Sequence, residues 1–155
     1  MRQLAIALLL VVGGLVTTAC PASVKTGVSP IADIANAGGK IEDSGQAIFQ
    51  AVVTAHNTSP TTVSQTVEDN VALAVNKLGH AGLALNTTLT AYNQAKAAGS
   101  DLTAQKAAVQ AALVAVSDFL ASINKALPVG TIQAIDAIVN SIIDIVAQVK
   151  LGVGL

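Results

Sequence analysis

Aromatic residues and cysteine are the scarcest features of this sequence. Among 155 residues there is no tryptophan, one tyrosine, two phenylalanines and a single cysteine, Cys20. One thiol cannot form an intrachain disulfide, so the fold must be held together by packing alone. Since ligand cavities are lined largely by apolar and aromatic side chains, the near absence of aromatic rings also argues against a roomy cavity.

Charge is sparse as well, with 8 Lys and Arg residues against 9 Asp and Glu residues. The only arginine is Arg2, and the lysines are scattered singly along the chain. Nucleic-acid binding needs a concentrated basic face, so a nucleic acid is excluded as a partner. A polybasic patch for an anionic membrane surface is absent for the same reason.

The first twenty residues have the features of an export signal. Basic Arg2 is followed by an apolar run from Leu4 to Val16, and the small residues Thr17-Thr18-Ala19 precede Cys20. This arrangement resembles the signal peptides of bacterial lipoproteins, which end in a lipobox of the Leu-Ala-Gly-Cys type. Thr18 and Ala19 match the small residues tolerated there, whereas Thr17 stands where an aliphatic residue is usual.

The resemblance implies that Cys20 is a lipidation site. Residues 1–19 would be removed as a signal peptide, the thiol of Cys20 would receive a diacylglyceryl group, and its amine would take a fatty acid such as palmitate. The protein would then be anchored in a membrane of the bacterial cell envelope, facing the periplasm or the cell exterior. Two interpretations without lipid remain open. The protein could be exported in soluble form after cleavage at Ala19 or Ala22. Alternatively, the apolar run could stay as an uncleaved anchor, although it is shorter than the roughly 20 residues of a spanning helix.

The remainder of the chain predicts an all-α protein. Alanine is the most common residue, and it combines the highest helix propensity with close approach of helix axes. We expect a tether over residues 20–30, one alanine-rich helical bundle over residues 31–150 and a frayed tail over residues 151–155. Short links and matched lengths indicate an antiparallel up-down bundle of about four helices.

Apolar stripes at helical spacing place these helices at residues 31–56, 62–98, 102–127 and 132–150. The stripes comprise Ile34, Ile41 and Ile48; Val71, Leu78, Leu85 and Tyr92; Val109, Leu113, Val116, Leu120 and Ile123; and Ile132, Ile135, Val139, Ile142, Val146 and Val149. Gly38-Gly39 is expected to weaken or kink the first helix, for which two shorter helices are an alternative. Thr62 and Gln65 have capping-box spacing before the second helix, and Gly99 is expected to end it in a left-handed conformation.

The fourth expected helix, residues 132–150, has the widest apolar arc. Its Ile and Val residues would also suit a strand, but the spacing of three and four favours a helix. Asp136 and Asp144 make membrane spanning by an isolated helix costly. A core helix is therefore preferred to one that binds a membrane interface or a partner.

Chemistry-bearing residues are few, and we predict no catalytic, cofactor-binding or metal-binding residues. His56 and His80 lack the neighbours of a metal site. Ser122 and Lys125 have the Ser-x-x-Lys spacing of penicillin-recognising enzymes without their other motifs. The adjacent carboxylates Glu42-Asp43 and Glu68-Asp69 are attributed to helix starts, where the helix dipole favours negative charge.

These observations predict a non-enzymatic, membrane-anchored envelope lipoprotein that acts as a helical scaffold or protein-interaction module. Its partners would be membrane lipid, through acylated Cys20, and a protein partner or a second copy of the chain. Two alternatives are a soluble exported protein that binds a small apolar ligand and a membrane-interacting protein that acts through residues 132–150.

Overall fold

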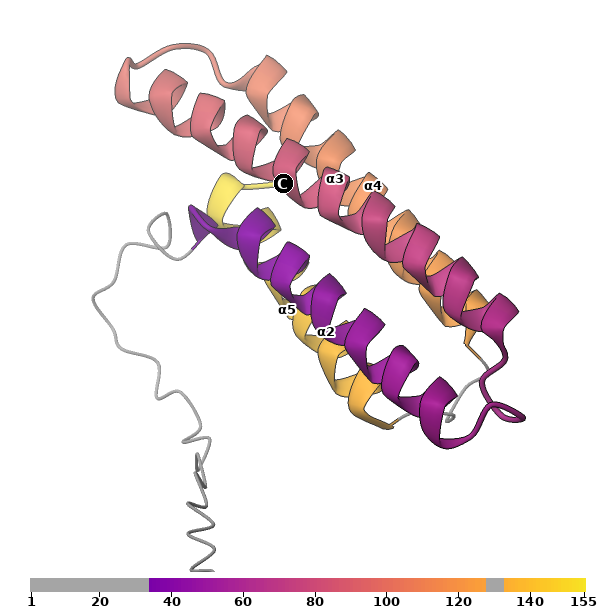
Figure 1. Ribbon diagram of the computed structural model, residues 1–155. Helices are drawn as coiled ribbons and strands as arrows, with labels where there is room; N and C mark the ends of the chain where they lie inside the picture. The colour runs from indigo at the N-terminus through magenta and orange to yellow at the C-terminus, as the bar shows by residue number, and fades with distance from the viewer. Residues whose placement is uncertain (1–33, 128–132) are drawn as a thin grey trace, which may run out of the picture.

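The computed structural model describes residues 34–127 and 133–155, which form four helices joined by short links. The helices are α2 (Ala37–Thr58), α3 (Gln65–Ala97), α4 (Thr103–Ala126) and α5 (Gln133–Val153). They run in alternating directions, with α2 beside α3 and α5, and α3 beside α4 (Figure 1). No strand occurs within the described ranges, so the prediction of an all-α antiparallel four-helix bundle is confirmed.

The helices differ in length, which gives the bundle an uneven end. With 33 residues, α3 is about 50 Å long at ~1.5 Å per residue, whereas α2 has 22 residues and α5 has 21. The hairpin of α3 and α4 therefore projects beyond the ends of α2 and α5 (Figure 1). The α2–α3 and α3–α4 interfaces are the most extensive, while α5 packs mainly on α2 and less on α4.

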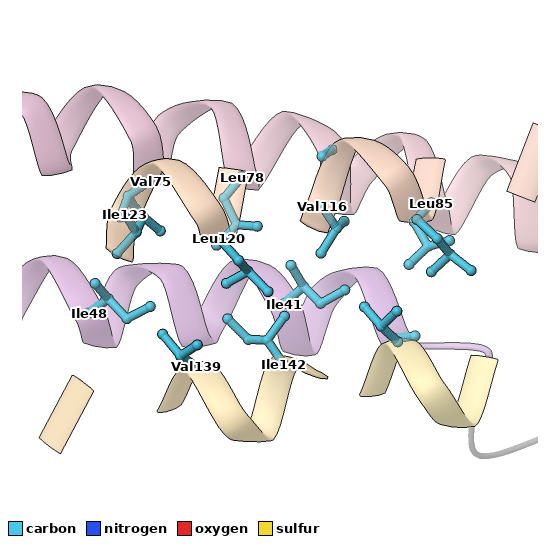
Figure 2. Close-up of a cluster of buried hydrophobic side chains, with 14 of the residues drawn as sticks. Ile41, Ile48, Val75, Leu78, Leu85, Val116, Leu120, Ile123, Val139 and Ile142 are labelled. Atoms are coloured by element: carbon cyan, nitrogen blue, oxygen red, sulfur yellow. The ribbon is translucent and has the colours of Figure 1, made fainter. Parts of the chain in front are cut away.

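The predicted apolar stripes, as far as the structure describes them, face the centre of the bundle. Figure 2 shows side chains from the four helices meeting there, among them Ile41, Ile48, Leu78, Leu85, Val116, Leu120, Ile123, Val139 and Ile142. Ile41, Leu78 and Ile142 are 0% exposed. Among the described residues, no polar or charged residue is buried, so the interior is held by aliphatic packing.

The helix expected over residues 31–56 is interrupted by a turn. This turn lies before the pair Gly38-Gly39 that was expected to kink the helix, and not at it. Ala35 and Asn36 form a turn after Ile34, and α2 begins at Ala37. Asn36 has the non-helical angles φ −107° and ψ 18°, and its carbonyl accepts a hydrogen bond from Lys40 N–H at 3.0 Å. Gly38 and Gly39 therefore lie in the first turn of an unbroken helix.

The predicted cap of α3 is wrong by two residues. The capping residue is Ser64, in an extended conformation, and its Oγ accepts a hydrogen bond from Val67 N–H at 3.4 Å. Thr62 instead lies in a turn, with its N–H donated to the carbonyl of Ser59 at 2.9 Å. Between them Val63 is 1% exposed, so its burial fixes the path of the link and moves the helix start to the following serine.

The glycine that ends α3 behaves as predicted. Gly99 has φ +66°, a left-handed conformation that favours glycine because it has no Cβ. Ser100 N–H donates to the carbonyl of Ala95 at 3.0 Å, which satisfies one of the last carbonyls of the helix.

The end of α5 contradicts the expectation of a frayed tail over residues 151–155. The helix continues through Val153, which is only 2% exposed. Val153 extends the buried stripe of Val146 and Val149, so its burial stabilises one further turn. Gly154 then ends the helix with φ +73° and donates its N–H to the carbonyl of Lys150 at 2.9 Å.

Several predicted features lie outside the described residues: the signal peptide, Cys20, the tether, the first residues of the helix expected over residues 31–56, and Ile132. Among the described helices, α4 alone is long and apolar enough to cross a membrane by length and composition. The core helix of a bundle has the same properties, and 33% of its most apolar window is buried. The widest apolar arc belongs to α5, but Asp136, Asp144 and Lys150 give that helix more charge than a spanning segment carries.

Candidate functional site

The two histidines lie on different helices and have different surroundings. His56 is at the end of α2, where its Nδ1 lies 2.6 Å from the carbonyl oxygen of Val63. This contact joins the last turn of α2 to the link that precedes α3. His80 is exposed in the middle of α3. Within the described residues, no group of three or more His, Cys, Asp or Glu side chains could hold a metal ion.

The Ser-x-x-Lys pair lies near the end of α4. Ser122 Oγ donates a hydrogen bond to the carbonyl of Asp118 at 2.9 Å, one helical turn earlier. Its hydroxyl hydrogen is therefore engaged by the backbone and is not directed at Lys125. The two residues are nevertheless brought together on the wall of a surface groove.

The helix-dipole explanation applies to Glu68 but not to the pair Glu42-Asp43. Glu68 lies in the first turn of α3, where the positive end of the helix dipole stabilises a negative charge. Glu42 and Asp43 lie beyond the first turn of α2, which contains no acidic residue. The expectation that they mark a helix start is wrong, because α2 begins at Ala37 and runs unbroken past Gly38-Gly39, so both residues lie in its second turn. Both side chains are exposed to solvent.

Two helices approach closely where Gly38 of α2 meets Gly82 of α3. A Cβ on Gly38 would overlap the carbonyl oxygen of Gly82 and would lie 2.7 Å from Cγ of Asn86. The N–H of Gly38 donates a hydrogen bond to Oδ1 of Asn86 at 3.0 Å. Of the glycines at positions 79 and 82 of α3, only Gly82 makes a close approach, since a Cβ on Gly79 would meet nothing within 4 Å.

The last residues of the chain are hydrogen-bonded to the α3–α4 hairpin. Tyr92 is buried in α3, and its hydroxyl donates to the carbonyl of Val153 at 3.4 Å. Lys106 of α4 donates from Nζ to the carbonyl of Gly154 at 3.1 Å. These contacts link the end of the chain to α3 and α4, on which α5 packs less than on α2. Sequence reasoning did not find them because they join residues more than 45 positions apart.

Hollows large enough for a small ligand lie on the surface between helices. One of about 590 Å³ lies at the end of α2 and is lined by uncharged residues: Gln50, Ala51, Thr54, Ala55, Thr58, Ser59, Thr62, Val63 and Ala134. Another of about 360 Å³ lies between α3 and α4. Its lining contains two lysines beside apolar side chains.

Comparison with known proteins returned no relationship. No protein-family model matches the sequence, and no curated protein and no solved structure matches it significantly.

Proposed function

We propose that this protein is a non-enzymatic lipoprotein of the bacterial cell envelope, anchored in a membrane through acylated Cys20. The helical bundle is then the part that acts at the membrane surface, as a scaffold or as a module that binds another protein. The observation that carries the anchoring is the pattern of residues 1–20, in which a basic start, an apolar run and three small residues lead to the only cysteine.

The interior of the bundle is consistent with a presenting role. Side chains that face one another across its centre are aliphatic, among them Ile48, Leu85, Ile123 and Ile142. Such an interior supplies rigidity. Polar groups that could recognise a partner lie on the outside, on helices whose relative positions the core fixes.

The outer face of α4 is the surface best suited to another helix. It carries exposed alanines together with Val114, which is 48% exposed; the alanines are Ala104, Ala107, Ala108, Ala111 and Ala121. Small side chains let a second helix come close, so either a partner helix or a second copy of the chain could pack here.

The anchoring is tested by metabolic labelling with a radioactive or clickable palmitate analogue in a bacterial host, followed by separation of membrane and soluble fractions. We expect the wild-type chain to incorporate the fatty acid and to sediment with membranes. Cys20→Ala should lose the label, because no other thiol is present to accept a lipid.

Ser23→Ala is the matched control, since it alters a small polar residue near the junction and leaves Cys20 in place. It should be labelled like the wild-type protein. Continued labelling of Cys20→Ala would overturn the proposal, as would an unlabelled wild-type chain in the soluble fraction.

A further inference from the structure

A groove on the outer surface of the α3–α4 pair has an unusual composition for this chain. It encloses about 360 Å³, and its lining is Asn70, Leu73, Ala74 and Lys77 from α3 with Phe119, Ser122, Lys125 and Ala126 from α4. We refer to it as the lysine groove. Pockets for small ligands span roughly 300–1,000 Å³, so it is large enough for a slender molecule.

Helical spacing explains why these residues converge. Positions 70, 73, 74 and 77 recur at steps of three and four, which places them on one face of α3. Positions 119, 122 and 126 do the same on α4. Because the two helices are antiparallel neighbours, these faces form opposite walls of the groove near the start of α3 and the end of α4.

The lining of the groove includes apolar side chains that are partly open to water. Leu73 is 57% exposed, although most large aliphatic side chains of the described helices are buried. Phe119 is half-buried and packs against the core from the edge. Ala74 and Ala126 leave room between them, so a hydrocarbon chain laid here would remove Leu73 and Phe119 from water.

The polar rim of the groove has one sign of charge. Lys77 and Lys125 line it, and no carboxylate does. Asp118, the one acidic residue of α4, is exposed and is not part of the lining. Ser122 has already donated its hydroxyl hydrogen to the backbone. Within the part of the chain that the structure describes, the lining donors without a partner are therefore the two ammonium groups and the Asn70 amide.

We propose that the lysine groove binds a single-chain amphipathic anion, a fatty-acid carboxylate. The carboxylate lies between Lys77 and Lys125, and the acyl chain covers Leu73 and Phe119. A small inorganic anion would leave Leu73 and Phe119 in water, and a cationic amphiphile would meet two like charges. This binding is independent of the proposed anchoring, because it uses only residues of α3 and α4.

The test is calorimetric titration of the full chain with decanoate, which stays monomeric at millimolar concentration. The protein carries Cys20→Ala so that no acyl group of its own competes, and every variant keeps the same leader. We expect saturable binding of decanoate, and no measurable binding of inorganic phosphate or of decyltrimethylammonium. Amide shifts in an NMR titration should centre on the eight lining residues.

Matched variants distinguish binding in the lysine groove from nonspecific binding through charge or apolar surface elsewhere on the protein. Lys77→Gln/Lys125→Gln should weaken decanoate binding by about tenfold or more, since charge-assisted hydrogen bonds are lost. Lys40→Gln/Lys96→Gln changes the net charge equally on exposed lysines outside the groove and should have no effect. Leu73→Ser should weaken binding, whereas Leu83→Ser, at a similarly exposed leucine of α3 (53%), should not.

Circular dichroism melts establish that each variant is folded, which is expected because all substituted side chains are exposed. The proposal is overturned if decanoate does not bind, if the groove variants bind it like the wild type, or if decyltrimethylammonium binds equally well. Binding of phosphate as tight as that of decanoate would also overturn it, because the site would then recognise charge alone.

Discussion

At the scale of single residues, the contact of Gly38 with Gly82 is the point where one added methyl group matters most. The backbones of α2 and α3 touch there, and the N–H of Gly38 is held by Asn86. Any side chain on Gly38 would push the helices apart and break that hydrogen bond.

We therefore predict that Gly38→Ala lowers the free energy of unfolding by about 1–3 kcal/mol, the usual cost of overpacking. Urea denaturation followed by circular dichroism would measure it. Gly79→Ala is the control, because its Cβ would meet nothing within 4 Å. That variant should be as stable as the wild type or gain up to about 1 kcal/mol from helix propensity. Equal effects of the two substitutions would contradict the close crossing.

A single carboxylate stabilises the start of α4. Oδ1 of Asp101 accepts hydrogen bonds from the backbone N–H of Thr103 at 3.0 Å and from its hydroxyl at 2.8 Å. These bonds lower the pKa of the Asp101 carboxyl below its usual value, and the bond from the hydroxyl has the larger effect. The charged form is thus favoured in the folded protein, although the group is fully exposed.

A lowered pKa in the folded state stabilises the protein above the pKa of the unfolded chain, about 3.9, and this stabilisation is lost as the pH falls through the folded value. Asp101→Ala should therefore be less stable than the wild type at pH 7, and the difference should shrink below about pH 4. Urea midpoints of both proteins across this range would show it. A difference that stays constant with pH would mean that the charge contributes nothing.

At the scale of helices, the sequence predicted the elements well and their ends poorly. Aliphatic residues repeat at the helical period because only one side of each helix faces the core, so the stripes could be recognised without a structure. Helix ends depend on contacts between distant segments. Ser64 caps α3 in place of Thr62 because Val63 is buried. Val153 remains helical because its side chain is buried and its carbonyl accepts a hydrogen bond from Tyr92 of α3.

Dependence on contacts between distant segments also explains why the Gly38–Gly82 contact and the lysine groove were not predicted. Gly79 and Gly82 look alike in the sequence, and only the rotation of α3 decides which of them meets α2. The lysine groove combines two helices whose residues lie about 50 positions apart, and the spacing of Ser122 and Lys125 was interpreted only as a weak enzyme motif. Cys20, by contrast, depends on local sequence alone, and its lipidation stays a prediction.

The final turn of α5 offers a test at this scale. Val153 is 2% exposed, so Val153→Ala should cost roughly 1.5 kcal/mol at ~0.8 kcal/mol for each buried methylene equivalent removed. Leu151→Ala is the matched control, because Leu151 is 82% exposed, and it should change stability by less than about 0.5 kcal/mol. Thermal unfolding would compare them. Equal melting temperatures for the two variants would indicate a frayed end.

At the scale of the whole molecule, one aliphatic core couples the four helices. Ile142 of α5 is 0% exposed and lies among side chains of α2 and α4 (Figure 2). Since α5 packs less extensively than the other helices, its attachment depends on a few such residues.

Ile142→Ala should lower the free energy of unfolding by about 2–5 kcal/mol, because it leaves a cavity in the core. The neighbouring Ile143 is 51% exposed, and Ile143→Ala should have an effect within about 0.5 kcal/mol. Denaturant midpoints at equal protein concentration would decide. An unchanged midpoint for Ile142→Ala would instead point to a helix that leaves the bundle to face a partner or a membrane.

The bundle and its proposed anchor together describe a rigid helical body held at a membrane surface by lipid. Mass spectrometry of the protein purified from bacterial membranes tests that most directly. The account predicts an N-terminal peptide that begins at Cys20 and carries the mass of a diacylglyceryl group and a fatty acid. A peptide that begins at Met1, or at an unmodified residue near the junction, would contradict it.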